Sequence, residues 1–269
     1  MSMVSLADLE KARRQKQQIS TLASIGRKYL VMSGKGGVGK TTVAVNLAAA
    51  KAAEGYKVGL LDVDLHGPSV AASLGLERPL DTDEDGRLIP AESGPGLKVV
   101  TIQGLLQSRD EAVIWRGPKK IRAIRQFFSE VAWGKLDYLF IDAPPGTGDE
   151  PMTVLQAVRD VQPLVVTSGS RLSIADVAKA LNFLKLMQHP AFGLIDNQSY
   201  YFCPECGLDT EIHNRLAPAK LAEEFGVPLL ASLPLDLTAA KAAEEGCPLV
   251  WSRPKSSFAC LINDLSAKL

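Results

Sequence analysis

A glycine-rich run with two lysines is the part of the sequence best suited to chemistry. It reads Ser-Gly-Lys-Gly-Gly-Val-Gly-Lys-Thr-Thr over residues 33–42, after an apolar run and before a helical pattern. Glycines let successive backbone N–H groups face one phosphate, and a helix N-terminus adds partial positive charge. The pattern G-x-x-x-x-G-K-[ST] in this setting predicts a nucleotide-binding P-loop. The residues expected to bind the nucleotide are Gly34, Lys35, Gly36, Gly37, Val38, Gly39, Lys40, Thr41 and Thr42.

Three side chains of this loop have separate expected roles. Lys40 is expected to be catalytic by bridging the outer phosphates, and the Thr41 hydroxyl is expected to bind Mg²⁺. Lys35 stands directly after the first glycine, where it cannot easily reach the phosphates that its own chain holds. A plain glycine-rich turn is the alternative interpretation, but it does not explain why a strand, a Lys-Thr pair and a helix occur in this order.

Aspartates follow two further predicted strands, at the strand ends where α/β folds place their ligands. Asp62 and Asp64 come at the end of the run 58–62, and Asp142 ends the run 137–142. We expect Asp142 to hold Mg²⁺ directly or through water, and Asp62 to support the same ion. The alternative is that these aspartates cap helices or stabilise turns.

The expected base is adenine. Guanine-specific P-loop proteins commonly use an [NT]-K-x-D loop, and the nearest string, Gly134-Lys135-Leu136-Asp137, lacks the first residue. Asn197 closes the predicted strand 192–196, and an amide at that position can pair with N6 and N7 of adenine. The sequence therefore predicts ATP with Mg²⁺ as the ligand.

Two of the four cysteines lie close together. Cys203 and Cys206 form a CxxC turn, whereas Cys247 and Cys260 stand alone. Two thiolates make half of a tetrahedral site for Zn²⁺ or an iron–sulfur cluster, and a second subunit would supply the other half on a two-fold axis. A structural Zn²⁺ clamp, a thioredoxin-like redox pair and uncommitted thiols remain alternatives.

The composition is that of an ordinary globular chain. Its 269 residues include 30 basic and 30 acidic side chains, and 46% of the residues are hydrophobic. Zero net charge argues against dedicated binding to nucleic acid or to an anionic membrane. No apolar run approaches a membrane span and cysteines are few, so we expect a cytoplasmic protein. The helical apolar spacing in residues 256–269 predicts a core-packing helix instead of a membrane anchor.

Apolar runs alternate with helical patterns along most of the chain, which predicts an α/β fold with three layers, a mostly parallel central sheet flanked by helices. We expect one P-loop ATPase domain over residues 28–269 and an N-terminal arm over residues 1–27, flexible or forming a short helix. The acidic, turn-rich segment 81–95 predicts a surface loop. Strands are expected at 29–33, 58–62, 97–102, 137–142, 163–167, 192–196 and 229–233. Helices are expected at 40–54, 119–131, 174–187, 217–225 and 237–245.

The run KGGVGKT resembles the deviant P-loop of the dimeric ATPases that include MinD, ParA and the nitrogenase iron protein. This resemblance implies that Lys35 reaches across to the nucleotide of a partner subunit. It implies that Asp64 orients the attacking water, and that ATP closes a homodimer.

Further strings narrow the resemblance. SGKGGVGKTT, DVDLHGPS, IWRGP (residues 114–118), LDYLFIDAPPGTGD and SYYFCPECG occur in the order found in the Mrp/ApbC family of iron–sulfur carrier ATPases. Related MinD and ParA proteins lack the IWRGP and CPxCG elements. The resemblance implies that Cys203 and Cys206 of two subunits hold a labile [4Fe-4S] cluster, which the protein delivers to apo iron–sulfur proteins. It implies that cluster-assembly factors are partners as well. It implies slow ATP hydrolysis and places Asn197 near the base.

The sequence departs from this family at two places. His66 stands where we expect an aromatic residue, and residues 208–218 lack the glycine-rich run that commonly follows the CxxC. His213 in that segment is a candidate spare metal ligand. The alternative function is a Zn-clamped dimeric targeting or scaffold ATPase, although the large apolar client-binding insertion of such proteins is not found here.

Overall fold

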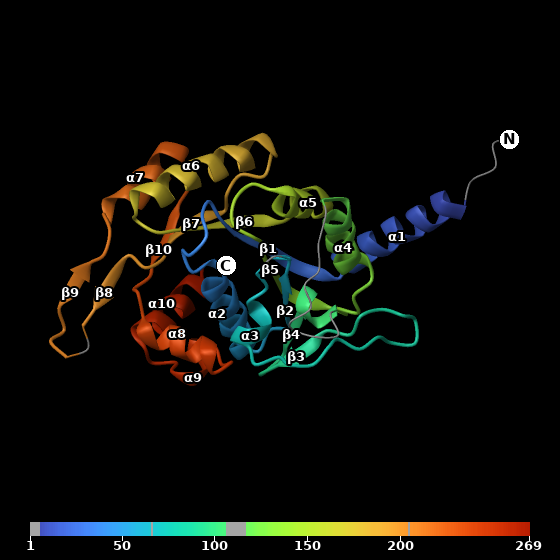
Figure 1. The fold of residues 1–269 in the computed structure, drawn as a ribbon, viewed down its shortest axis with the longest axis horizontal. Helices are drawn as coiled ribbons and strands as arrows, with labels where there is room; N and C mark the ends of the chain where they lie inside the picture. The colour runs from blue at the N-terminus through green and yellow to red at the C-terminus, as the bar shows by residue number, and fades with distance from the viewer. Residues whose placement is uncertain (1–5, 66, 106–116, 204) are drawn as a thin grey trace.

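A computed structural model of the chain describes residues 6–65, 67–105, 117–203 and 205–269. Its centre is a sheet of eight strands, of which only β3 runs antiparallel to its neighbour. The strands are β1 (Ile25–Ser33), β2 (Val58–Asp62), β3 (Ala91–Ser93), β4 (Leu97–Thr101), β5 (Leu136–Asp142), β6 (Gln162–Thr167), β7 (Gly193–Asp196) and β10 (Leu229–Ser232). They lie in the order β10-β7-β6-β1-β5-β2-β4-β3 (Figure 1). The predicted mostly parallel α/β sheet is confirmed.

Helices cover both faces of this sheet, and each face has its own apolar core. One layer consists of α2 (Lys40–Ala53), α3 (Val70–Ser73), α8 (Leu237–Glu244), α9 (Leu249–Ser252) and α10 (Ser257–Ser266). The other consists of α4 (Gly117–Ser129), α5 (Asp149–Ala157), α6 (Arg171–Leu186) and α7 (Leu216–Phe225). A short 3₁₀ helix, η1 (Ile102–Leu105), follows β4. Strand β1 sends Tyr29 and Val31 into the first core and Leu30 and Met32 into the second, as expected for a strand buried on both sides.

The order of the strands creates a ligand-binding position at the end of β1. From β1 the chain passes outward to β2 and β4, returns to β5, and then crosses to β6, β7 and β10 on the other side of β1. In open α/β sheets such a reversal leaves a crevice at the carboxyl ends of the strands. The P-loop, the aspartates after β2 and β5, and Asn197 after β7 all lie at this edge.

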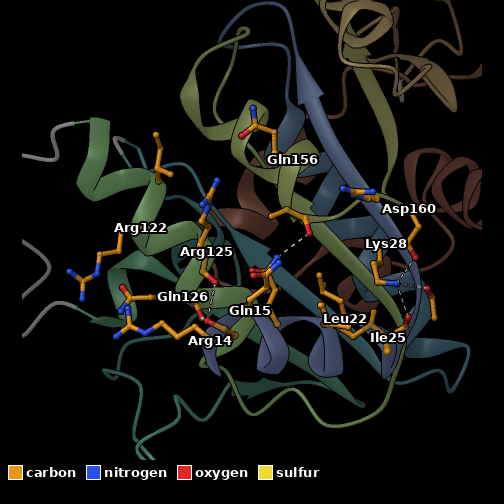
Figure 2. Close-up of a pocket in the computed structure, with 18 of the residues that line it drawn as sticks. Arg14, Gln15, Leu22, Ile25, Lys28, Arg122, Arg125, Gln126, Gln156 and Asp160 are labelled. Atoms are coloured by element: carbon orange, nitrogen blue, oxygen red, sulfur yellow. Dashed lines mark hydrogen bonds and ion pairs between the residues drawn. The ribbon is translucent and has the colours of Figure 1, made fainter. Parts of the chain in front are cut away.

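Helix α1 (Leu6–Ala23) precedes the sheet, lies beside α4 and projects beyond the domain in Figure 1. The Gln18 side-chain amide donates a hydrogen bond to the Ala157 carbonyl at 3.1 Å, and Leu22 packs against the second core (Figure 2). The N-terminal segment therefore contains an 18-residue helix that contacts the domain, whereas the sequence predicts an arm that is flexible or forms a short helix. Strand β1 also begins at Ile25, earlier than expected, because buried Ile25 pairs with Leu136 while Gly26 and Arg27 are exposed.

Two small sheet elements are not predicted by the sequence. The segment expected to be a surface loop contains β3, which pairs with β4, and an isolated bridge between Thr82 and Leu88. Strands β8 (Tyr200–Phe202) and β9 (Asp209–Glu211) form a separate antiparallel hairpin. Strands of three residues are too short to show an alternating pattern, and all three residues of β9 are exposed.

The last helix packs as predicted. Phe258, Ile262 and Leu265 of α10 are buried in the first core, next to α2. None of the described helices is long and apolar enough to cross a membrane.

Candidate functional site

The glycine-rich run connects β1 to α2 and places the first turn of that helix at the carboxyl edge of the sheet. Gly39 is the N-cap residue of α2 and has a φ of 79°, a backbone conformation that residues with a Cβ rarely adopt. The Gly39 carbonyl accepts the first helical hydrogen bond, from Val43 N at 3.0 Å. The free N–H groups of the following residues therefore point out of the helix N-terminus, which is an anion-binding arrangement.

The beginning of the loop is tightly packed. A Cβ atom on Gly34 would lie 2.3 Å from the backbone carbon of Asp176 in α6, whereas a Cβ on Gly36 would meet only Pro145 Cγ at 3.8 Å. The two glycines are therefore constrained by different causes. At Gly34 the backbone of α6 leaves no room for a side chain. At Gly36 a side chain would extend into open space beside Pro145.

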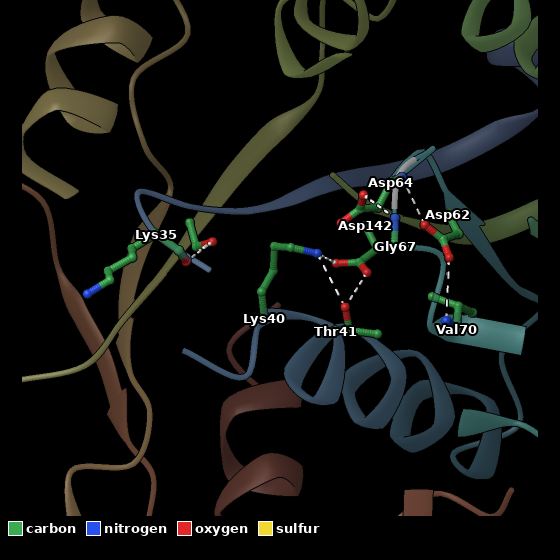
Figure 3. A network of polar contacts seen from close by, with 9 residues as sticks. Lys35, Lys40, Thr41, Asp62, Asp64, Gly67, Val70 and Asp142 are labelled. Atoms are coloured by element: carbon green, nitrogen blue, oxygen red, sulfur yellow. Dashed lines mark hydrogen bonds and ion pairs between the residues drawn. The ribbon is translucent and has the colours of Figure 1, made fainter. Parts of the chain in front are cut away.

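Lys40, Thr41 and Asp142 form one connected polar group (Figure 3). Lys40 Nζ lies 2.5 Å from Asp142 Oδ1, and Thr41 Oγ1 donates to Asp142 Oδ2 at 2.7 Å. The side chains of Lys40 and Asp142 are 7% and 1% exposed. The structure thus brings together the predicted phosphate-binding lysine and two of the three predicted Mg²⁺-binding groups.

A second buried carboxylate, Asp62, lies on the neighbouring strand in register with Asp142. It accepts backbone hydrogen bonds from Asp64 N at 2.9 Å and from Val70 N at 3.4 Å. Burial, followed by the charge of Asp142, raises the pKa of Asp62. Burial also raises the pKa of Asp142, while Lys40 and Thr41 oppose this shift.

These two carboxylates suit a divalent cation. Lys40 is the cation that the described structure places in direct contact with Asp142, so the pair carries excess negative charge when both groups are ionised. An ion ligated by hard oxygen atoms would lower both pKa values and replace the lost hydration. Thr41, Asp62 and Asp142 lie next to one another and supply hard oxygen atoms, so they fit Mg²⁺.

The two other predicted catalytic residues are Asp64 and Lys35. They lie on opposite sides of the Lys40–Asp142 ion pair in Figure 3. Asp64 Oδ1 accepts a hydrogen bond from Gly67 N at 3.1 Å, which shapes the loop after β2. The Lys35 side chain is exposed and extends away from Lys40 and Asp142 (Figure 3). In this conformation Lys35 does not serve the nucleotide site of its own chain. His66 lies outside the described residues.

Asn197 is placed beneath the P-loop by β7. Its Nδ2 donates to the Val38 carbonyl at 2.8 Å, and the residue is 4% exposed. That bond engages one of the two N–H donors of the amide, so it does not by itself prevent the second N–H and the side-chain oxygen from pairing with N7 and N6 of adenine. The sequence placed Asn197 near the nucleotide but gave no sign of its contact with the loop.

The CxxC pair lies at the turn of the β8–β9 hairpin. Gly207 N donates to the Cys203 carbonyl, and Cys203 N donates to the Leu208 carbonyl, both at 2.9 Å. Backbone N–H groups of Cys206 and Glu205 lower the pKa of the Cys203 thiol. Cys203 is half-buried and Cys206 is exposed. The turn therefore presents a stabilised thiolate and a second thiol to solvent, in the manner of a metal knuckle.

Other possible ligands lie elsewhere. Cys247 follows α8 and Cys260 lies in α10, in the helix layer that contains α2. The Cβ of His213 lies against the loop at Gly169, where an added Cβ would meet it at 3.0 Å. Within the described residues, no three His, Cys, Asp or Glu side chains are grouped to hold a metal ion. Of the motif IWRGP, residues 114–116 lie outside the described part of the chain.

An arginine that the sequence analysis did not single out holds the hairpin. The Arg215 guanidinium lies 4.4 Å over the Tyr200 ring and pairs with Asp209, so it contacts both β8 and β9. Its backbone N–H also donates to Glu211 at 3.3 Å. These contacts connect the hairpin to the start of α7 through cation–π and ionic interactions. In the sequence, only the presence of an aromatic, an acidic and a basic residue on the two sides of the CxxC hints at these contacts.

Asp196, next to Asn197, is fully buried at the end of β7. Burial raises the pKa of Asp196 to about 6, while Ser199, His213 and Arg215 lower it by smaller amounts. A carboxyl group with a raised pKa stabilises the folded state while it is protonated, and this contribution is lost as the pH rises through the folded-state pKa. The end of β7 thus carries a pH-sensitive group between the P-loop and the hairpin.

The first prediction concerns Gly34 and Gly36. We expect Gly34→Ala to lower the free energy of unfolding by about 1–3 kcal/mol or more, because its methyl group overlaps the backbone of α6. Gly36→Ala should change it by less than about 0.5 kcal/mol. Denaturant unfolding of both variants without nucleotide measures this. Equal losses of stability would contradict the close packing of β1 on α6.

The second prediction concerns Asp196. From about pH 4 to about pH 7, Asp196→Asn should become more stable relative to the natural chain by about 2 kcal/mol, because the variant has no carboxyl group to ionise in the core. Chemical denaturation over this range gives the two curves. Asp264→Asn, which removes an exposed carboxylate from the outer side of α10, is the control. A constant difference for Asp196→Asn would show that Asp196 titrates normally.

Comparison with known proteins agrees with this arrangement. Residues 24–269 match the model of a family described as the NUBPL iron-transfer P-loop NTPase, within the ParA group. The chain is 43% identical over 237 residues to an iron–sulfur cluster carrier protein of Methanocaldococcus jannaschii, covering 88% of this chain and 82% of that protein. It is 39% identical over 266 residues to the mouse cytosolic Fe-S cluster assembly factor NUBP2, covering 97% of each chain.

Solved structures show the same fold. A nucleotide-binding protein of Archaeoglobus fulgidus in complex with ADP superposes with a TM-score of 0.75 at 35% identity, covering 86% of this chain and 91% of the other. The cell division ATPase MinD of Pyrococcus furiosus superposes with a TM-score of 0.67 at 25% identity, covering 90% and 98%. The resemblance to iron–sulfur carrier ATPases of the MinD and ParA class is thereby confirmed. The chain belongs to the NUBPL iron-transfer family of P-loop NTPases.

Proposed function

We propose that this protein is a homodimeric, ATP-binding carrier that holds a labile [4Fe-4S] cluster between its subunits and transfers it to apo iron–sulfur proteins. The observation that carries the proposal is the exposed CxxC turn, which offers two thiols and is joined by no third ligand among the described residues. Two such turns related by a two-fold axis would supply four thiolates. Relatives named iron–sulfur cluster carrier proteins support the same cargo.

The nucleotide site supports ATP binding and slow hydrolysis. Lys40 forms an ion pair with Asp142 at the start of α2. The phosphates of a nucleotide would compete with Asp142 for Lys40, and Mg²⁺ would compete with Lys40 for Asp142. In this proposal Lys40 would leave Asp142 and contact the outer phosphates, and Thr41, Asp62 and Asp142 would hold Mg²⁺. Mg²⁺ would supply charge neutralisation at the β- and γ-phosphates. Asp64 is the proposed group that orients the attacking water.

Lys35 makes the proposed site depend on the partner. Its side chain leaves its own P-loop, so it is free to enter the nucleotide site of a second subunit placed face to face. A cation at the γ-phosphate stabilises charge that develops during phosphoryl transfer. Binding of ATP would therefore favour the closed dimer, and loss of the γ-phosphate would release it.

The cargo is exchanged through the cysteines. Thiolates of a recipient protein would replace Cys203 and Cys206 at the iron atoms one by one, so transfer needs no net oxidation. The exposure of Cys206 supports this step, because an incoming thiolate must reach the cluster. We propose apo iron–sulfur proteins and cluster-assembly factors as partners, and a cytoplasmic location in which the thiols stay reduced. The mouse relative bears the name of a cytosolic assembly factor.

Domain roles follow from the same arrangement. In this proposal residues 28–269, together with the start of β1 from Ile25, form the ATPase domain with the cluster-binding hairpin, and the segment that contains α1 forms an arm that takes no part in nucleotide or cluster binding. The arm contains no cysteine. A Zn-clamped targeting or scaffold ATPase is the competing function, because four thiolates also suit Zn²⁺.

The third prediction tests the cargo. After anaerobic reconstitution with iron and sulfide, the natural protein should carry about four iron and four sulfide per dimer. Cys203→Ala and Cys206→Ala should carry none, whereas Cys260→Ala, which removes an exposed thiol in α10, should match the natural protein. Absorbance, iron and sulfide analysis measure the cluster. Zinc in oxygen-free purified protein, with no cluster after reconstitution, would establish the competing function instead.

The fourth prediction tests the role of Lys35. With Mg-ATP, light scattering should detect a dimer for the natural protein and for Lys255→Ala, which changes an exposed lysine elsewhere. Lys35→Ala should still bind ATP but hydrolyse it at least about 100-fold more slowly and dimerise poorly. Lys40→Ala should lose ATP binding itself. ATP hydrolysis by Lys35→Ala at the natural rate would remove the lysine from the mechanism.

A further inference from the structure

A large depression lies at the opposite end of β1 from the P-loop. It is bounded by α1, α4, the end of α5 and the start of β1, and it has a volume of about 1100 Å³ (Figure 2). Ile25 and Lys28 at the beginning of β1 line it, whereas the nucleotide site follows the other end of the same strand. We call this depression the arm groove. The proposed nucleotide and cluster chemistry makes no use of it.

The arm groove is positively charged although the chain as a whole has no net charge. Arg122 and Arg125 stand one turn apart on the outer side of α4, and Arg159 follows α5. All three are exposed, and within the described residues none of them forms an ion pair. Arg14 of α1 lies 3.4 Å from Glu130, and buried Lys28 lies 2.7 Å from Asp160. The cationic groups therefore outnumber the acidic groups that neutralise them.

Apolar side chains lie among these cations. Ile19 of α1 is 63% exposed at the edge of the groove, and Leu22 and Ile121 are half-buried inside it. Figure 2 shows Arg14, Arg122 and Arg125 gathered toward one end, and Leu22 and Ile25 toward the other. One half of the groove is thus cationic, and the other half is mainly apolar, with the Lys28–Asp160 ion pair beside Ile25.

We propose that the arm groove binds an acidic segment of a partner protein in which carboxylate side chains alternate with apolar ones. Arginine guanidinium groups bind carboxylates through two parallel hydrogen bonds, and the apolar half supplies area for the interleaved side chains. Charge complementarity brings the segment to the groove, and burial of apolar surface retains it. This inference does not depend on the cargo carried by the cysteines.

Other occupants fit these observations less well. A phosphate ion would leave the apolar half exposed to water. A single-stranded nucleic acid requires stacking platforms, and no Phe, Tyr or Trp is among the residues that line the groove. A membrane surface prefers a convex apolar face, whereas the exposed Ile19 borders a depression. An extended or helical peptide satisfies both halves at once.

The fifth prediction uses a fluorescein-labelled peptide in which glutamates alternate with leucines. Fluorescence anisotropy should show saturable binding to the full-length protein, weakened by salt. A peptide with glutamine in place of each glutamate, and another with serine in place of each leucine, should bind at least about tenfold more weakly, because each lacks one half of the complementarity. Equal binding of all three peptides would overturn the proposal.

Protein variants locate the binding surface. Arg122→Glu/Arg125→Glu should weaken binding by about tenfold or more, and Arg159→Glu on the other wall should weaken it in the same direction. Arg253→Glu/Lys255→Glu, a charge-matched change near α9 and α10, should change it by less than about twofold. Circular dichroism is used to check that each variant is folded. If Arg122→Glu/Arg125→Glu is unfolded, Arg159→Glu alone tests whether the groove binds the peptide.

Competition separates the possible occupants. Inorganic phosphate, a single-stranded oligonucleotide and phosphatidylserine vesicles are each added to the bound peptide. Failure of all three to displace it at matched ionic strength is expected. Displacement by any one of them, lost in Arg122→Glu/Arg125→Glu, would assign the groove to that ligand and overturn the peptide proposal. Equal loss of peptide binding in Arg253→Glu/Lys255→Glu would show that only overall charge matters.

Discussion

The ion pair between Lys40 and Asp142 is the interaction on which the nucleotide site depends. Both groups are almost fully buried, and Asp62 lies beside them on the next strand. A buried pair of this kind is strongly destabilising when one partner is removed, because an uncompensated charge then stays in the core. Without nucleotide, each group holds the other in place. In the proposed function, nucleotide and metal ion would give both groups new partners, so the ion pair would couple the packing of the site to ligand binding.

The parallel sheet explains how residues far apart in the sequence reach one another. Three strand ends bring Asp62, Asp142 and Asn197 to the helix that begins at Lys40. Because both faces of the sheet are covered by helices, these polar groups are accessible only from the carboxyl edge. The amino edge carries the arm groove instead. The two ends of β1 therefore serve separate surfaces, and a partner on one need not displace a ligand from the other.

Most of the central fold could be predicted because its signals are local. Continuous apolar runs predicted the long strands to within a few residues, and the glycine-lysine pattern located the P-loop. The β8–β9 hairpin and β3 escaped prediction because three residues carry too little periodicity. The contacts of Asn197 with Val38 and of Arg215 with Tyr200 escaped it because each joins segments whose proximity is decided by the tertiary fold. The polar start of β1 likewise concealed its pairing with β5.

The position of the cysteines on a two-stranded hairpin has an energetic consequence. Such a hairpin is marginally stable in water on its own, and here it relies on one arginine and a few backbone hydrogen bonds. Bonds from both thiolates to one inorganic centre would close the turn and restrict its motion, so part of the binding free energy would be spent on ordering the chain. When a recipient protein removes the inorganic centre, the hairpin regains its conformational entropy, and this gain favours transfer. The marginal stability of the hairpin therefore lowers the affinity of its thiolates for the inorganic centre. A lower affinity makes release of that centre easier.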